Sequence, residues 1–232
     1  MEQKIIQPIA IPGIHNRFFK LFEESAKSFN NPKVLDAGAG HGALSKKIHE
    51  AGYNVEACDL FPEIFYYDKV PFKKADITSS LPYDDDTFDI VIAVEVMEHI
   101  HDHEQFFKEC FRIMKSGGIL LLSTPNILSL KSRIRFLFSG FYYSFEPLNH
   151  QLNNGLQHVA SLTVDQYRNI AIRTKFSDMQ VFIDKKQGTS KAYLFLLPFM
   201  WMYCKMKKID FCVHNKHNYL TGRILFLKLF KK

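Results

Sequence analysis

The sequence predicts an α/β protein whose mostly parallel sheet is covered by helices on both faces. Three observations support this fold class. Strand and helix patterns alternate through residues 14–126, the strand segments are continuously apolar, and a glycine-rich turn follows the first strand. Continuously apolar strands are typical of sheets that are buried on both faces, and strand–helix alternation favours parallel pairing.

The predicted elements follow one another without long linkers. A helix over 14–29 has apolar residues near the helical period and ends at Asn30, Asn31 and Pro32. Helices are also expected over 43–51 and 102–115, the latter capped by Asp102 with Gln105 at its third position. Strands are expected over 33–37, 54–58, 72–75, 88–94 and 119–123, the last one after a turn at 116–118.

Four acidic residues stand at or just past the ends of these predicted strands. They are Asp36, Asp59, Asp76 and Glu95. The carboxyl ends of parallel strands meet at one edge of the sheet, which is where open α/β sheets bind ligands. Any one acid could be incidental, but the four together indicate a site at this edge.

The glycine-rich turn has the sequence VLDAGAGHG over 34–42. Glycines at this point let the backbone turn tightly and approach a ligand, and the following helix offers its N–H groups. The G-x-G-x-G spacing differs from the G-x-G-x-x-G of dinucleotide turns, and Asp36 would repel a pyrophosphate. The turn therefore favours S-adenosylmethionine, a cationic cofactor without phosphate, over the nicotinamide cofactor of a dehydrogenase. A strand–turn–helix without ligand is the alternative.

The pattern loosens after Asn126. Residues 127–160 are aromatic and basic, a capping-box sequence at Thr163 starts a helix to about Lys175, and strands return at 179–183 and 223–228. An apolar segment over 192–204 is interrupted by Pro198 and flanked by lysines. This segment is too short to span a bilayer.

The bulk composition sets only broad limits. A chain of 232 residues is expected to form a single domain, and its net charge of +6 permits nucleic acid, anionic lipid or acidic glycan as a partner. The four cysteines lack metal-binding spacing, and the start of the chain lacks the pattern of a signal peptide. We therefore expect a reducing, cytoplasmic location, with membrane association as a further possibility.

With these residues in order, the chain resembles the class I S-adenosylmethionine-dependent methyltransferases. The resemblance rests on VLDAGAGHG, on Asp59, on the segment 75–100 and on MKSGGILLLSTPN over 114–126, where Ser116 replaces a frequent proline. It implies a Rossmann-like, doubly wound, mostly parallel seven-stranded sheet with an aromatic and basic insertion after the fifth strand. It also implies one methyltransferase domain over 1–232. Residues 14–126 would be its cofactor half, and residues 127–232 its acceptor half, which covers the acceptor and supplies the last strands.

The resemblance implies a role for each residue of the cofactor site. Asp59 would bind the ribose hydroxyls, Asp76 the adenine amino group, and Leu60 and Ile77 would sandwich the adenine ring. Arg17 would meet the methionine carboxylate, although a solvated helix face is an equal alternative. The full expected set is Arg17, Asp36, Gly38, Ala39, Gly40, Gly42, Asp59, Leu60, Asp76, Ile77 and Glu95.

The catalytic candidate is His99, in the segment Glu95-Val96-Met97-Glu98-His99. Its pKa would suit a general base for an acceptor hydroxyl, whereas the alternative is a histidine that only orients a loop. Some related methyltransferases bind a divalent metal with a similar cluster, which here would be Glu95, Glu98, His99 and His158. The surrounding motif matches that group only in part, so we expect no metal.

The acceptor is expected to be a small molecule, a lipid-linked intermediate or a glycan, because STPN precedes a basic aromatic stretch that would lie over it. Segment 192–208 is a possible peripheral membrane contact, with a buried helix or a dimer contact as alternatives. An RNA acceptor is less favoured, since no RNA-binding module is recognisable. A cofactor-binding protein without catalysis is a further alternative. The sequence does not define an oligomeric state.

Overall fold

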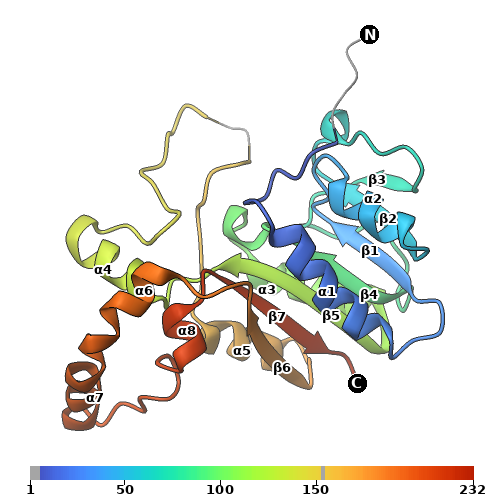
Figure 1. The fold of residues 1–232 in the computed structure, drawn as a ribbon. Helices are drawn as coiled ribbons and strands as arrows, with labels where there is room; N and C mark the ends of the chain where they lie inside the picture. Colours follow the sequence, from blue (N-terminus) through green and yellow to red (C-terminus); the bar gives the residue numbers. More distant parts are fainter. Residues whose placement is uncertain (1–5, 153–154) are drawn as a thin grey trace.

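The computed structural model describes residues 6–152 and 155–232, which build a seven-stranded sheet in the order β3-β2-β1-β4-β5-β7-β6 (Figure 1). The strands are β1 (Lys33–Ala37), β2 (Asn54–Asp59), β3 (Phe72–Lys74), β4 (Phe88–Ala93), β5 (Met114–Pro125), β6 (Asp178–Ile183) and β7 (Ile224–Phe230). All neighbours are parallel except β7, which runs antiparallel to both β5 and β6. The predicted Rossmann-like, mostly parallel seven-stranded sheet is confirmed.

Helices cover both faces of this sheet. They are α1 (Ile14–Ala26), α2 (Ala43–Glu50), α3 (His103–Ile113), α4 (Leu130–Ser139), α5 (Val164–Arg173), α6 (Gly188–Ala192), α7 (Leu197–Met206) and α8 (His217–Thr221). Short 3₁₀ helices are η1 (Pro62–Ile64), η2 (Met97–His99) and η3 (Tyr193–Leu196).

Alternate residues of the central strands feed two separate cores. On one face, Val34 and Ile92 pack with apolar side chains of α1 and α2. On the other face, Leu35 and Val91 pack with side chains of α3 and α5. Successive strand residues point to opposite faces, so a strand that is apolar at every position supplies both cores. This confirms the prediction from the continuous apolar runs.

Two helix starts have the predicted caps. The side chain of Asp102 accepts a hydrogen bond from the Gln105 N–H at 2.9 Å. Thr163 and Gln166 form the reciprocal capping box at the start of α5. These caps involve neighbours along the chain, which is why local sequence was sufficient to place them.

The predicted turn at 116–118 needs a correction, because β5 already begins at Met114. Its register against β4 shifts between Phe88 and Ile90, so the extra residues are accommodated as an irregularity of the strand. Backbone groups of Gly117 and Gly118 pair with Lys231 just beyond β7. Pairing with Lys231, which is distant in the sequence, therefore lets β5 start before the turn that the local sequence predicted.

The chain after Asn126 contains helices that the sequence did not predict. Ser129 caps α4 by accepting from the Ser132 N–H, and Gly140 ends it in a left-handed conformation. Pro198 does not interrupt the apolar segment, since it lies in the first turn of α7, where a missing N–H is tolerated. Within the described ranges, helices long and apolar enough to cross a membrane are absent.

Candidate active site

A cavity of about 490 Å³ opens at the carboxyl ends of β1, β2 and β4. This volume lies in the usual range of small-molecule and cofactor sites. The predicted residues in its wall are Gly38, Ala39, Gly40, Asp59, Leu60, Asp76, Ile77, Glu95 and His99. The structure therefore brings most of the predicted site into one cavity, although contact with a cofactor itself stays a prediction.

Asp59 ends β2 with both carboxylate oxygens fixed by backbone amides. Oδ2 accepts from the Gly40 N–H at 2.8 Å, and Oδ1 accepts from the Phe61 N–H at 3.0 Å. Each oxygen keeps a second lone pair for a ligand hydroxyl. The carboxylate is thus oriented in advance for a pair of donors such as a ribose diol.

The glycines of the turn supply space rather than amide donors. The Gly38 N–H donates to the Cys58 carbonyl at 2.9 Å, and the Gly40 N–H is taken by Asp59. Gly38 has φ +77°, and a Cβ there would lie 2.5 Å from Val96 Cγ2. A side chain at this position would therefore collide with the segment after β4 and change the shape of the cavity wall.

The adenine end of the predicted site is more open. Asp76 forms a local turn in which Oδ1 accepts from the N–H and hydroxyl of Thr78 at 2.9 and 2.6 Å. Leu60 is exposed and Ile77 half-buried, and both line the cavity. Such apolar side chains beside a carboxylate suit a flat ring with an amino group.

Arg17 and Gly42 lie outside the cavity lining, and their cofactor roles stay predictions. The Arg17 guanidinium donates to the Gly13 carbonyl at 3.1 Å and lies 3.9 Å from Asp184. A Cβ at Gly42 would lie 2.8 Å from the ring of Phe65. Arg17 therefore braces its own helix start, and Gly42 allows the 61–67 segment to pack against the turn.

Asp36 is also absent from the cavity wall. Its side chain is buried and accepts a hydrogen bond from the Ser45 hydroxyl at 2.6 Å. Burial raises the pKa of Asp36 to about 6, and the charge of Asp59 adds to this rise against the opposing hydrogen bond from Ser45. The acid thus links the end of β1 to α2 through Ser45, and its role beside a cofactor stays a prediction.

Glu95 follows β4 in a left-handed backbone conformation, with φ +56°. Its N–H donates to the Ser123 hydroxyl at 2.7 Å, and that hydroxyl donates to Glu95 Oε1 at 3.1 Å. Burial raises the pKa of Glu95 to about 7, against the opposing effects of Ser123 and Arg223. A non-glycine residue held at positive φ is strained, and such residues concentrate at functional sites.

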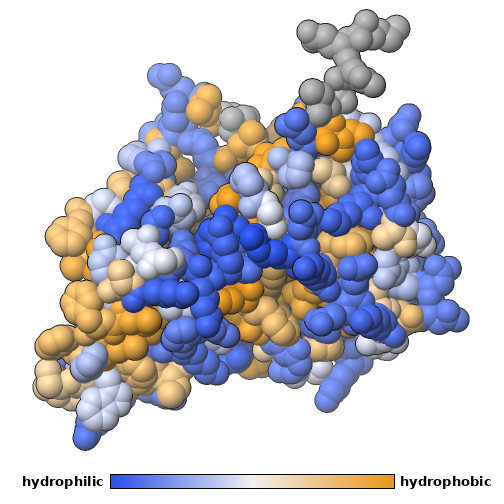
Figure 2. Space-filling view, in the orientation of Figure 1, coloured by the Kyte–Doolittle hydropathy of each residue, from blue (hydrophilic) through white to orange (hydrophobic). Residues whose placement is uncertain are grey.

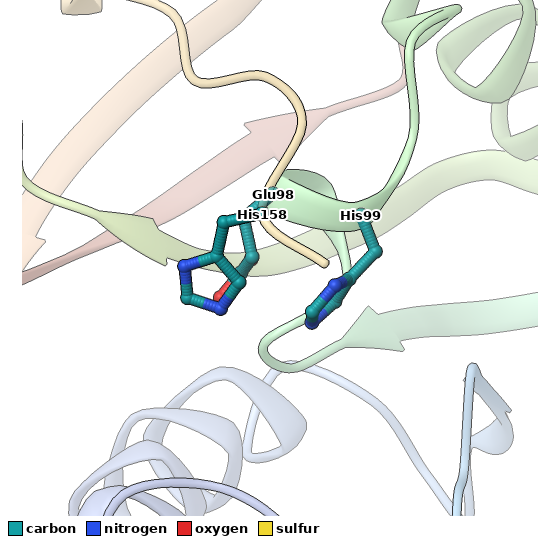
Figure 3. Close-up of side chains that lie close together, drawn as sticks. All are labelled: Glu98, His99 and His158. Carbon is teal, nitrogen blue, oxygen red and sulfur yellow. The ribbon is translucent and has the colours of Figure 1, made fainter. Parts of the chain in front are cut away.

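Glu98, His99 and His158 all line the cavity, and their side chains lie together (Figure 3). Ligand atoms of the three side chains all lie within 4.8 Å of one another, and the two imidazole rings meet edge to face at 4.9 Å. Glu98 and His99 come from η2, whereas His158 comes from the loop before α5. Its neighbours Val159 and Ala160 donate backbone N–H bonds to the Glu98 carbonyl, at 2.8 and 3.3 Å, and so fix the loop against η2.

The orientation of His99 follows from one hydrogen bond. Its Nδ1 lies 3.0 Å from the carbonyl oxygen of Gln157, which can only accept. Nδ1 must therefore carry the proton, which leaves Nε2 with a lone pair toward the cavity. Burial lowers the pKa of His99, and the Gln157 carbonyl opposes this, so the neutral ring is favoured near neutral pH.

The cluster has the chemistry of a divalent-cation site. Among the described residues, both carboxyl oxygens of Glu98 and the Nδ1 of His158 are buried without a hydrogen-bond partner. Burial and the charge of Glu95 raise the pKa of Glu98 well above its usual value. A buried carboxyl without partners is unfavourable, and a cation would supply the partner. Glu95 is not part of this set, because its carboxyl is engaged with Ser123.

Sequence reasoning missed the segment that covers the glycine turn. Residues 7–11 and His15 line the cavity, and the Ile9 side chain approaches Gly40. Burial lowers the pKa of His15 to about 4, and the Lys47 charge acts in the same direction. Ser144 and Leu156 of the loop after α4 complete the wall. Local patterns carried no signal for these residues, since only folding brings them to the cavity.

Comparisons with known proteins agree with this geometry. Residues 35–122 match a family model described as a methyltransferase domain. A probable S-adenosylmethionine-dependent methyltransferase of Mycolicibacterium smegmatis is 31% identical over 126 residues, which are 50% of this chain and 49% of that protein. The ubiquinone biosynthesis O-methyltransferase of Pelagibacter ubique is 30% identical over 136 residues, 55% of this chain and 56% of that protein. The chain thus spans about half the length of these curated relatives.

Solved structures share the fold. A methyltransferase from Archaeoglobus fulgidus that depends on S-adenosylmethionine superposes with a TM-score of 0.61 at 17% identity, covering 94% of this chain and 93% of that one. Phosphoethanolamine N-methyltransferase 2 of Haemonchus contortus, in complex with S-adenosylmethionine, gives a TM-score of 0.59 at 15% identity, covering 99% of this chain and 54% of that one. Residues 35–122 thus match a methyltransferase domain, and the chain is similar in sequence and in fold to methyltransferases that depend on S-adenosylmethionine.

Proposed function

We propose that this protein transfers the methyl group of S-adenosylmethionine to a hydroxyl of a small-molecule, lipid-linked or glycan acceptor. One observation carries the proposal. The fixed Asp59 carboxylate, the glycine turn and the Nε2 of His99 all belong to the wall of a single cavity. Cofactor and acceptor would therefore meet in one cavity, with a neutral base in its wall.

The roles of the residues follow from their positions. S-adenosylmethionine, when bound, supplies a methyl group on an electrophilic sulfonium. Asp59 would hold the ribose hydroxyls, and Asp76 with Leu60 and Ile77 would hold the adenine ring. His99 Nε2 would accept the proton of the acceptor hydroxyl as its oxygen attacks the methyl carbon, which leaves the sulfur as a neutral thioether.

Relatives support oxygen as the accepting atom. Several of the matching curated proteins are ubiquinone biosynthesis O-methyltransferases, including the human mitochondrial protein at 27% identity over 153 residues. The part of the wall that follows α4 consists of Ser144, Gly155, Leu156 and His158, without lysine or arginine, which suits a small acceptor more than RNA. An RNA acceptor would require binding that falls steeply with salt.

The cofactor assignment is tested by calorimetry with S-adenosylmethionine and, as comparator, NAD. Asp59→Ala removes two charge-assisted hydrogen bonds, so we expect S-adenosylmethionine affinity to fall by about 10²- to 10³-fold. Circular dichroism would confirm that the variant is folded, because Asp59 also holds Gly40. Equal binding by both proteins, or preferred binding of NAD, would refute the proposal.

A divalent cation held by Glu98, His99 and His158 is a second candidate feature of the same reaction. It is favoured by the orphaned Glu98 oxygens and by the mixed imidazole and carboxylate donors, which suit a first-row divalent ion. Such an ion would lower the pKa of an acceptor hydroxyl. Metal analysis of protein purified without chelators should find one equivalent in wild type and none in Glu98→Gln. No bound metal, together with unchanged turnover after chelator treatment, would exclude it.

The acceptor class is tested by transfer of labelled methyl from S-adenosylmethionine to fractionated cell extract. We expect label in the lipid or small-molecule fraction, with a glycan fraction as the next candidate. Label confined to RNA would replace the proposed acceptor class. Saturable cofactor binding with no labelled fraction would support a binding protein without catalysis.

A further inference from the structure

The segment between β6 and β7 leaves a large apolar surface open to solvent. Residues of α7 and its flanks have more than half of their side-chain surface exposed: Phe195, Phe199, Trp201, Met202, Tyr203, Met206 and Ile209. None of the ten residues of α7 is buried. In Figure 2 apolar surface gathers over the end of the molecule that carries α4 and α7. We call residues 193–209, with Leu137 and Phe138 of α4, the apolar tip.

Three other strongly exposed apolar side chains stand away from this surface. Ile9 and Leu60 belong to the cavity, and Ile172 stands on α5 apart from the apolar tip. In the tip, α4 contacts η3, so Phe138, which is 83% exposed, lies on the same end as the α6–α7 segment. A contiguous apolar patch of this kind marks an interaction site, whereas single exposed residues need no explanation.

The chemistry of α7 favours a lipid surface over a protein partner. The helix has the sequence LPFMWMYCKM, with a single charged residue and exposed apolar side chains around its circumference. A helix that is apolar around its whole circumference is typical of one surrounded by an apolar environment, such as the acyl region of a bilayer, whereas a protein partner usually covers one face. Trp201 and Tyr203 are the residue types that prefer the headgroup level of a bilayer.

The positive charges around the apolar tip favour a lipid surface with negatively charged headgroups. Lys191, Lys205, Lys207 and Lys208 are exposed and border the apolar residues. Residues 188–209 contain no aspartate or glutamate, so this positive charge is not neutralised within the segment. The Lys205 ammonium lies 4.9 Å from the Trp201 ring, which places charge and aromatic surface together. Lysines beside an apolar patch attract the negative surface of anionic bilayers.

The tip is also held in place by the folded domain. The Arg133 guanidinium of α4 donates to Asn215 Oδ1 at 2.6 Å and to the His214 carbonyl at 2.8 Å. The Ser190 hydroxyl accepts from the Lys131 N–H at 3.2 Å, which joins α6 to α4. Docking would therefore require little ordering of the tip.

We propose that the apolar tip inserts into the boundary between headgroups and acyl chains of an anionic bilayer. A ten-residue helix is about 15 Å long by its rise per residue, so it lies in one leaflet and does not span. The inference goes beyond the proposed reaction and does not depend on it, because lipid binding is measured without cofactor or acceptor.

The test is flotation of the full-length protein with vesicles of phosphatidylcholine alone or mixed equally with phosphatidylglycerol. We expect association with the mixed vesicles at low salt, and at least about tenfold weaker association with neutral vesicles or at high salt. Phe195→Ser combined with Phe199→Ser should weaken binding at least about tenfold. The control is Ile172→Ser, since Ile172 is 67% exposed, comparable to Phe199 at 63%, and should leave binding unchanged.

The charge contribution is tested with Lys205→Glu, Lys207→Glu and Lys208→Glu together. Each lysine should contribute about fivefold to vesicle binding at low salt. The control reverses three exposed lysines elsewhere, Lys20, Lys27 and Lys69, with the same change in net charge. The proposal would be overturned if both triple variants lost vesicle binding equally, or if the Phe and Ile172 variants did. It would also be overturned if the wild-type protein associated with neither vesicle. A dimer in light scattering that is abolished by the Phe195 and Phe199 changes would instead assign the tip to a second copy of the chain.

Discussion

The two halves of the chain differ in what holds them in place. In the cofactor half, 14–126, neighbouring parallel strands place their ends at one edge and two apolar cores fix them. In the acceptor half, the described residues between Arg133 and Thr163 include no buried side chain. This stretch is fixed by polar contacts, such as Arg135 with the Phe145 carbonyl at 3.0 Å and with Glu146 at 2.6 Å.

The two halves of the chain also contribute different parts of the cavity wall. Much of the wall is built from the ends of β1, β2 and β4, whereas Ser144, Leu156 and His158 come from a loop that polar contacts hold. His158 comes from the loop before α5, yet its imidazole lies beside His99 and Glu98, which follow β4. The reacting groups are therefore expected to lie at the boundary between the two halves.

The largest expected effect comes from that boundary. His99→Gln removes the proposed base, so the rate of methyl transfer should fall by about 10²- to 10⁴-fold. Binding of S-adenosylmethionine should stay within about threefold of wild type, because the ligand contacts proposed for Asp59 remain. Turnover assays and calorimetry give the two quantities. The matched control is His101→Gln on the surface nearby, and similar turnover in both variants would remove His99 from the mechanism.

Two glycines with the same backbone conformation test whether rigidity differs between the halves. Gly38 and Gly140 have φ +77° and +72°, but only at Gly38 would a Cβ meet a neighbour, Val96 Cγ2 at 2.5 Å. Gly140→Ala should lower the free energy of unfolding by about 1 kcal/mol from backbone strain alone. Gly38→Ala should lower it by about 2–4 kcal/mol, because overlap adds to strain. Urea unfolding measures both, and equal losses would contradict the packed turn.

The buried acid of the cofactor half predicts a pH effect. The pKa of Asp36 is raised to about 6, so the folded state binds its proton more tightly than the unfolded chain. Ionisation of this group therefore costs stability as the pH rises from about 4 to about 6, and the cost persists above that range. Asp36→Asn keeps an acceptor for Ser45 and removes this cost.

The free energy of unfolding of Asp36→Asn relative to wild type should then rise by about 1–3 kcal/mol between pH 4 and pH 7. Urea titrations at the two pH values measure the difference between the proteins, which cancels the titration of all other groups. A difference that stays constant, or that falls with pH, would show that Asp36 is not a buried carboxyl with a raised pKa.

The smallest expected effect concerns the acceptor half. Gln157 bonds Asn149 through both its side-chain atoms, and its carbonyl positions His99. Gln157→Ala should reduce stability by less than about 1 kcal/mol, since these contacts lie at the surface. Turnover should nevertheless fall by about threefold to tenfold, because the loop that orients His99 loosens. Gln166→Ala, in the capping box of α5, loses a similar number of hydrogen bonds and should leave turnover unchanged.

The sequence alone determined the features that depend on neighbours along the chain. The apolar run before the glycine turn predicted β1 over 33–37. Asp102 and Thr163 predicted their helix starts, and the acids at strand ends predicted one edge of the sheet. Parallel topology then implied that Asp59, Asp76 and Glu95 share a cavity with the glycine turn, as the structure confirms. Resemblance to a family added the assignment of S-adenosylmethionine.

Tertiary structure decided which of these residues face the cavity and what joins them from far along the chain. Arg17, Asp36 and Gly42 lie outside the cavity lining, where their side chains or backbone contact Gly13, Ser45 and Phe65. The segment 7–11 covers the glycine turn, and His158 reaches Glu98 across the boundary of the two halves. Such contacts depend on the paths of loops and on which hydrogen-bond partners compete for a side chain. Local patterns of apolar and polar residues predict neither.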